Sequence, residues 1–190
     1  MPAPVDFQKR SYQEEVMDDL ESGGYDLEQS LRELAFINKW LGGQQVLISG
    51  LSQLKDELIA GSNPVRIADL GCGGGDLLEM VRKWGNKNNL RMDLTGFDAN
   101  PNVINFAREF VAANDIHFEA LDIFDDAFQN REFDVVLLTL FCHHFTDEAL
   151  VKLLNQLQRQ TSTAILVNDL HRHPVPYYFI KVFTRLFSKT

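Results

Sequence analysis

Residues 67–76 read Ile-Ala-Asp-Leu-Gly-Cys-Gly-Gly-Gly-Asp, in which a short apolar segment ends in an acid and is followed by a loop with four glycines. Glycine adopts positive φ and lets the backbone approach a ligand without an intervening Cβ. The segment 77–81, Leu-Leu-Glu-Met-Val, predicts a helix, whose first N–H groups face whatever the loop holds. This order of elements is typical of loops that bind nucleotide-like cofactors at the carboxyl edge of a parallel sheet.

Three carboxylates, Asp69, Asp98 and Asp122, end successive predicted strands. Because the carboxyl ends of parallel strands share one edge, we expect these acids to line one crevice. Asp98 follows Gly75 by roughly 20 residues, the distance of an acid that accepts hydrogen bonds from ribose hydroxyls. The alternative is that each acid caps a helix or lies in a loop, and Asp122 taken alone fits that alternative equally well.

The spacing of the glycines distinguishes between cofactors. A dinucleotide-binding loop reads G-x-G-x-x-G and places a helix N-terminus against a pyrophosphate. Here the glycines stand at 71, 73, 74 and 75, and Asp69 and Asp76 flank them. Negative charge at these positions would repel a pyrophosphate, and it suits a ligand that carries an amine or a sulfonium.

The run from Asp69 to Gly75, combined with Asp98 and Asp122, resembles motif I of the class I S-adenosylmethionine-dependent methyltransferases of the small-molecule type. The resemblance extends over about residues 64–170. It implies S-adenosyl-L-methionine as cofactor and S-adenosyl-L-homocysteine as product. It also implies a cofactor site in which each part of the ligand has its own contacts: Asp69, Gly71 and Gly73 at the methionine part, Asp98 at the ribose hydroxyls, Ala99 against the adenine, and Asp122 with Ile123 at its amine and ring.

Two further segments resemble parts of this family. Residues 138–145, Leu-Thr-Leu-Phe-Cys-His-His-Phe, resemble the fourth motif, which closes over the cofactor near the reactive methyl group. Leu138 is therefore included among the predicted cofactor-binding residues. Residues 34–43 resemble the segment before the core in small-molecule members, and we expect them to help cover the site, with Trp40 as a candidate substrate contact.

His143 and His144 follow the fourth predicted strand and are the candidate catalytic residues. Methyl transfer from a sulfonium is an in-line displacement to which positioning of the nucleophile contributes much of the acceleration. A base helps where the acceptor is a hydroxyl, and imidazole titrates near neutral pH. We favour His144 over His143; the alternative is that one of them caps the next helix or packs in the loop.

Asp169, His171 and Arg172 follow the fifth predicted strand and are candidate substrate contacts, although a polar surface loop explains them as well. We predict no metal site, because no histidine pair has the i, i+4 spacing of a zinc site and no cysteine pair supports one. A divalent-metal methyltransferase of the catechol type is the alternative.

Helix-like periodicity over residues 27–41 and 44–60 precedes an alternation of strands and helices. The predicted strands are 65–70, 92–97, 116–121, 133–140 and 163–168. This pattern predicts an α/β fold with a doubly wound, mostly parallel, Rossmann-like sheet. We expect an N-terminal helical extension or lid at 1–63 and the S-adenosylmethionine-binding core at 64–190.

The family's sheet normally ends with a sixth strand and an antiparallel seventh, and neither is predicted after residue 168. Either the sequence is a piece of a longer chain, or the sheet ends early with an exposed edge. The expected cofactor residues all precede these missing strands. The substrate pocket, which the C-terminal elements of the family partly build, is therefore the part in question.

The net charge of −9 argues against nucleic acid as a partner, because phosphate binding needs Lys and Arg. Two cysteines without C-x-x-C spacing fit reduced thiols, and no signal peptide or membrane-length apolar run is found. These features predict a cytoplasmic protein without stable membrane insertion, and they leave the oligomeric state open.

The sequence thus predicts methyl transfer from S-adenosylmethionine to a small, apolar or aromatic acceptor at oxygen or carbon. Two alternatives remain. One is an NAD-dependent oxidoreductase, which would need wider glycine spacing and a residue for hydride chemistry. The other is a non-catalytic cofactor-binding module on the same fold.

Overall fold

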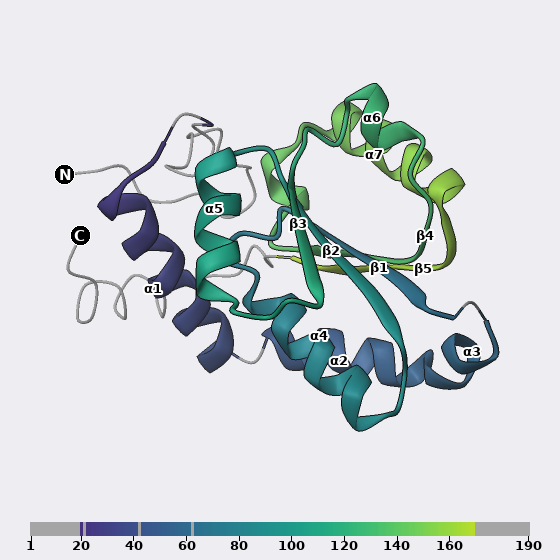
Figure 1. Ribbon diagram of the computed structural model, residues 1–190. Coiled ribbons are helices and arrows are strands. Elements are labelled where there is room, and N and C mark those ends of the chain that lie inside the picture. Colours follow the sequence, from purple (N-terminus) through teal and green to yellow (C-terminus); the bar gives the residue numbers. More distant parts are fainter. Residues whose placement is uncertain (1–19, 21, 42, 62, 170–190) are drawn as a thin grey trace.

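The computed structural model describes residues 20, 22–41, 43–61 and 63–169, and the side chains of 37–44 are not described. Its described part contains one five-stranded sheet (Figure 1). The strands are Val65–Leu70 (β1), Met92–Asp98 (β2), Ile116–Ala120 (β3), Phe133–Thr139 (β4) and Thr161–Asn168 (β5). The helices are Tyr25–Leu41 (α1), Gly43–Gln53 (α2), Lys55–Ala60 (α3), Asp76–Lys87 (α4), Pro101–Phe110 (α5), Asp126–Gln129 (α6), Asp147–Gln160 (α7) and the 3₁₀ turn Cys142–His144 (η2).

The strand order is β3-β2-β1-β4-β5, and every neighbouring pair is parallel. The predicted doubly wound α/β fold is therefore confirmed. The order reverses between β1 and β4, and ligands of such sheets bind outside the carboxyl ends of the strands at this reversal. The loops after β1 and β4 are thus the first place to look for a site.

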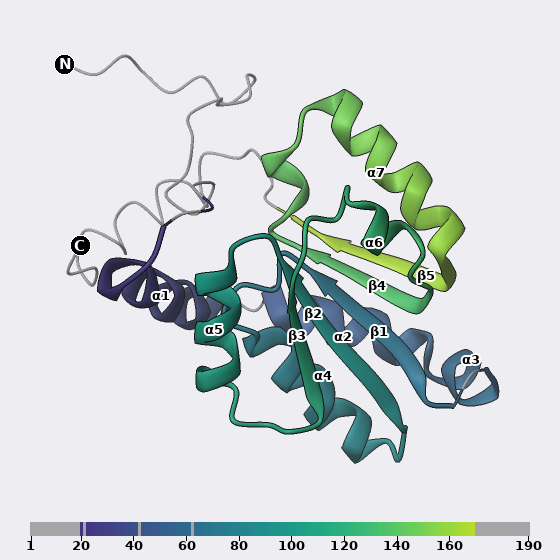
Figure 2. The ribbon, with the colours of Figure 1, turned by 45° about the horizontal axis from the view of Figure 1, so that its top comes forward.

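Helices cover both faces of the sheet (Figure 1, Figure 2). Helices α2, α4 and α5 pack on one face, where Ile67 of β1 and Leu137 of β4 are buried among them. Helices α6 and α7 cover the other face, where Leu70 and Leu138 are buried. Side chains of a strand alternate between its faces, so a strand covered on both sides is mostly apolar. Residues 135–138 of β4 follow this rule, while Asp134 is buried and accepts hydrogen bonds from the amide of Arg66 and the hydroxyl of Ser162.

The N-terminal helices differ in part from the expectation. The sequence predicted one helix over 44–60, and the structure instead has α2 and α3 with a bend at Leu54. Both helices turn apolar residues inward, since Leu47 and Leu51 of α2 and Leu58 of α3 are all buried in the same cluster as β1. Helix α2 is therefore part of the main core, and the predicted boundary between residues 63 and 64 stays a prediction.

Two helix starts follow the sequence signals. Asn100 caps α5 by accepting a hydrogen bond from the amide of Asn102 at 2.8 Å, with Pro101 in the first turn. Thr146 caps α7 through the amide of Ala149 at 3.3 Å. These caps fix where the chain leaves the carboxyl edge of the sheet after β2 and β4.

Candidate functional site

The glycine-rich loop connects β1 to α4. Gly71, Gly73 and Gly75 have φ values of 67°, 51° and 76°, a region that favours glycine, and Gly75 directly precedes α4. The amides of Gly71 and Cys72 both donate to the carbonyl of Phe97, at 2.9 and 3.0 Å. The loop is thus held against the end of β2.

Gly71 is a point of contact between this loop and the segment after β4. A methyl group added at Gly71 would overlap the ring of Phe141, which packs directly on the glycine. We expected Gly71 to leave room for a ligand. In this structure part of that room is taken by Phe141, so the site includes the aromatic ring as well as the glycines.

Asp98 lies at the end of β2 and faces the loop. Its carboxylate accepts hydrogen bonds from the amides of Gly73 at 3.3 Å and Asn100 at 3.0 Å. Burial raises the pKa of Asp98, while these two amides and the charge of His144 act in the opposite direction. Asp98 therefore joins the ends of β1 and β2, as the sequence predicted for an acid one strand over from the glycines.

Asp69 lies at the base of the loop and is only 2% exposed. Burial raises its pKa well above the ordinary value, and the nearby charges of Asp76 and Asp98 raise the pKa further. Among the residues that the structure describes, none donates a hydrogen bond to this carboxyl group. The base of the site is thus a cluster of acids that disfavours an anion such as pyrophosphate and would be stabilised by a cation.

The chain turns sharply after β4. Leu140 has φ of 51°, which is rare and strained for a residue other than glycine, and its amide donates to the carbonyl of Asn168 at 2.9 Å. This turn directs Phe141 toward Gly71. Phe145 packs edge-on against Phe141, with ring centroids 4.9 Å apart, and against Phe124, at 5.9 Å. Three aromatic rings therefore pack on one another at the turn after β4 and against the core under α6 and α7.

His143 is paired with a carboxylate from the next strand. Its ring Nδ1 lies 2.7 Å from one oxygen of Asp169, and its backbone amide donates to the other oxygen at 3.0 Å. The rings of His143 and His144 lie 4.2 Å apart, and His144 is exposed. Sequence reasoning assigned Asp169 to the substrate and missed this pair, although the ends of neighbouring parallel strands must lie together.

The remaining predicted cofactor residues lie farther from the loop or are covered. Ala99 is exposed beside Asp98, and Asp122 is exposed and accepts a hydrogen bond from the amide of Phe124 at 2.9 Å. Ile123 and Leu138 are buried in the cluster under α6 and α7. In this structure they would reach a ligand mainly through their backbones.

The structure does not describe the side chains of three predicted substrate contacts. Trp40 belongs to α1, but its side chain is not among those described. His171 and Arg172 lie outside the described residues. Their assignment stays a prediction from the sequence.

The N-terminal segment reaches the site at points that the sequence did not indicate. The amide groups of Asn100 and Asn102 both donate to the carbonyl of Ser22, at 3.0 and 3.1 Å. Leu31 of α1 is buried and lies 3.8 Å from the position of a Cβ on Gly73. Helix α1 lies beside α5 in both views (Figure 1, Figure 2), so it borders the glycine loop.

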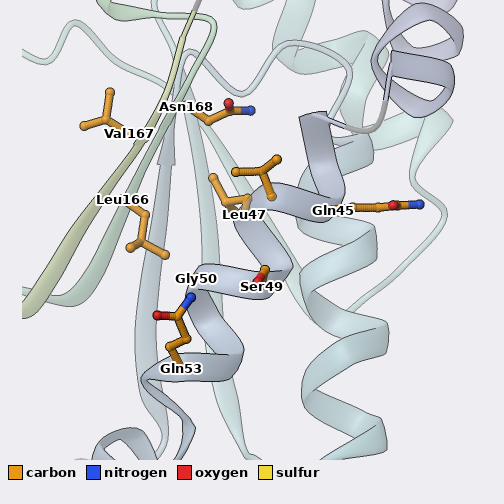
Figure 3. Close-up of a pocket in the computed structure, with 9 residues that line it drawn as sticks. Gln45, Leu47, Ser49, Gly50, Gln53, Leu166, Val167 and Asn168 are labelled. Carbon is orange, nitrogen blue, oxygen red and sulfur yellow. The ribbon is translucent and has the colours of Figure 1, made fainter.

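A separate groove runs between α2 and the edge strand β5. Leu47 and Gly50 of α2 face Leu166 of β5 across it (Figure 3). The groove contains none of the predicted site residues. We therefore place the candidate site at the glycine loop and not in this groove.

Comparison with known families shows which family the chain belongs to. The model of the methyltransferase domain family matches residues 67–163, more than half of the chain. The chain belongs to this family. The matched range contains the glycine loop, Asp98 and the histidines after β4, and the resemblance to class I S-adenosylmethionine-dependent methyltransferases is thereby confirmed.

Solved methyltransferase structures share this fold. The plantazolicin methyltransferase BpumL in complex with SAH is 26% identical with a TM-score of 0.58, and the match covers 80% of this chain and 60% of that one. Its complex with a monoazolic desmethylPZN analog and SAH is 24% identical with a TM-score of 0.60, covering 80% and 56%. Magnesium protoporphyrin IX methyltransferase from Synechocystis PCC 6803 is 17% identical with a TM-score of 0.57, covering 88% and 77%.

This chain therefore spans about 60% of the length of the plantazolicin methyltransferase. No curated protein sequence matches it. In the described part of the chain, no helix has the length and apolar character needed to cross a membrane. The same part contains no group of three His, Cys, Asp or Glu side chains that could hold a metal ion.

Proposed function

We propose that this protein binds S-adenosylmethionine at the glycine loop and transfers its methyl group to a small, apolar or aromatic acceptor, at oxygen or carbon. The observation that carries the proposal is the buried Asp69 with the partly buried Asp76 and Asp98 beside a left-handed glycine loop, in a chain of the methyltransferase family. S-adenosylmethionine supplies a methyl group made electrophilic by a sulfonium.

The residues present fit such a ligand. Asp69 near the end of β1 and Asp76 at the start of α4 would stabilise its positive charges, and Asp98 would hold the ribose hydroxyls while it keeps Gly73 in place. Ala99 would lie against the adenine, with Asp122 and Ile123 at its amine and ring. The plantazolicin methyltransferase, 26% identical, was crystallised with SAH, which supports the same cofactor here.

Phe141 has a role in this proposal. A cofactor that reached Gly71 would contact or displace this ring, because the two pack directly on each other. The ring would therefore border the cofactor on the side of the loop that carries His143 and His144. We expect Phe141 to contact the methionine part of the cofactor beside the path by which the acceptor approaches the methyl group.

The character of the acceptor is inferred from the surroundings of this loop. The rings of Phe124, Phe141 and Phe145 form a contiguous aromatic group there, which favours an apolar or aromatic molecule. The net charge of −9 disfavours a nucleic acid.

Isothermal titration calorimetry with S-adenosylmethionine, S-adenosylhomocysteine and NAD tests the cofactor. We expect micromolar binding of the first two ligands and no heat from NAD. Binding of NAD alone would reject the assignment and favour the oxidoreductase alternative.

Turnover separates an enzyme from a non-catalytic binding module. The measurement is transfer of a labelled methyl group from S-adenosylmethionine to a panel of phenols, quinones and fatty acids. A methylated product from this panel is the expected outcome. Cofactor binding without any product would favour the binding module.

A further inference from the structure

We infer that His143 and Asp169 form a dyad in which His143 takes the proton of an acceptor hydroxyl, so that the acceptor is a phenol or a similar weak oxygen acid. The inference rests on the proposed function and narrows it from oxygen or carbon to oxygen. It assigns the catalytic contact to His143 and a positioning role to Asp169.

The contacts of Asp169 fix the ring of His143. One carboxylate oxygen lies 2.7 Å from Nδ1, and the other accepts the backbone amide of the same residue at 3.0 Å. Since a carboxylate only accepts hydrogen bonds, Nδ1 must carry the proton, and Nε2 is then the basic nitrogen. The hydrogen bond from the backbone amide fixes the main chain of His143, and the contact with Nδ1 fixes its ring. Asp169 thus orients the imidazole through both groups.

The dyad lies on the loop that reaches the cofactor site. Phe141, two residues before His143, packs on Gly71, and the charge of His144, the next residue, acts on Asp98. The strained turn at Leu140 holds this loop in place through the carbonyl of Asn168, the residue before Asp169. The same junction of β4 and β5 therefore positions both members of the dyad.

The dyad is only partly exposed to solvent. The side chains of His143 and Asp169 are 24% and 17% exposed, so solvent screens their interaction only in part. Titratable groups beside His143 include His144 and Cys142 on the same turn, and the charge of His144 acts in turn on Asp98. Burial and the charge of Asp169 raise the pKa of Cys142 to about 11, which leaves this thiol protonated at neutral pH.

The step balances with these groups. The acceptor oxygen forms a bond to the methyl carbon as the carbon–sulfur bond breaks, and the electron pair of that bond stays on sulfur. The hydroxyl proton passes to Nε2 of His143, and Asp169 stabilises the resulting imidazolium. The products are a methyl ether, S-adenosylhomocysteine and a proton that the imidazolium later releases to water.

The first test needs no turnover. Nitrogen NMR of the full chain reports the tautomer of each imidazole, and the spectrum of His143→Gln assigns the signal. We expect the Nδ1–H form for His143, and Asp169→Asn should shift the tautomer and lower the imidazole pKa. An unchanged tautomer and pKa in Asp169→Asn would overturn the inference.

The second test uses 4-methylphenol and 4-nitrophenol, which have similar shapes but differ in acidity. For 4-methylphenol we expect His143→Gln and Asp169→Asn to lower kcat/KM by about 10²-fold or more, with KM little changed. The loss should be much smaller for 4-nitrophenol at a pH where its oxygen is already ionised. Asp169→Glu should recover part of the activity, and His117→Gln, on the exposed side of β3, is the matched control.

The outcomes separate this inference from the proposed function. Equal losses for the two phenols, or methylation of a carbon or amine acceptor in place of phenols, would overturn the dyad while the protein still binds S-adenosylhomocysteine. A larger loss in His144→Gln than in His143→Gln would overturn the assignment to His143. Failure of every variant and of the wild type to bind S-adenosylhomocysteine would reject the proposed function itself.

Discussion

Replacement of Asp98 by alanine tests the cofactor site most directly. In the structure this carboxylate accepts hydrogen bonds from the amides of Gly73 and Asn100. The substitution would remove the proposed partner of the ribose hydroxyls and would also leave the Gly73 amide without its acceptor. Both effects weaken cofactor binding, because the glycine loop is held less firmly when the ligand arrives.

The size of the effect follows from these bonds. A hydrogen bond to a charged group contributes about 1.5–3 kcal/mol. The carboxylate of Asp98 already has two amide donors, and its burial disfavours the charged form, so the gain from a ligand is smaller than two full bonds. We therefore expect a loss of about 1–3 kcal/mol, which is about 5- to 150-fold in the Kd of S-adenosylhomocysteine.

Calorimetry with S-adenosylhomocysteine measures this loss. Asp93→Ala is the matched control, because Asp93 lies on the same strand and is exposed to solvent. Asp98→Asn, which keeps one acceptor oxygen, should fall between the wild type and Asp98→Ala. An unchanged Kd in Asp98→Ala, or an equal loss in Asp93→Ala, would refute the placement of the ribose.

Two other predictions concern the same loop. Gly71→Ala should lower the free energy of urea unfolding by about 2–4 kcal/mol, since the new methyl group adopts a left-handed backbone and overlaps Phe141. Gly24→Ala has the same backbone cost and an open surrounding, so it should lose only about 1–2 kcal/mol, and equal losses would contradict the contact. Folding raises the pKa of Asp69 above its ordinary value of 3.8. Between that value and the raised pKa, the folded protein binds more protons than the unfolded chain. The free energy of unfolding should therefore fall as the pH rises through this range. Asp69→Asn should flatten this decline in urea titrations while weakening S-adenosylmethionine binding; a steeper decline in the variant would contradict the sign.

Much of the fold could be predicted because local signals and packing agree. The buried strands are mostly apolar segments between polar loops. The side chains of Asn100 and Thr146 accept hydrogen bonds from the first-turn amides of the helices that follow them, and so mark where those helices begin. The bend at Leu54 could not be predicted, since good helix formers surround it and only burial of both segments requires it.

The sequence predicted those features of the candidate site that follow from the positions of strand ends. It did not predict the contacts between residues that are distant in sequence. Asp69 and Asp98 gather as expected, because parallel strands bring them to one edge. The left-handed backbone of Leu140 has no local signal, since leucine rarely adopts it, and the bond to the carbonyl of Asn168 holds it. The pairing of His143 with Asp169 was within reach of the same strand-end reasoning, applied to β4 and β5.

The accessibility of the Cys72 thiol can be used to measure opening of the glycine-rich loop. Its sulfur is buried against Gly96, and burial with the charges of Asp69 and Asp98 raises its pKa well above the ordinary value. Alkylation of this sulfur therefore requires the turn to open, as in any local unfolding event. With Cys142 replaced by serine, Cys72 is the only thiol left in the sequence. Its rate of alkylation then measures how often the turn between β1 and α4 opens by local unfolding.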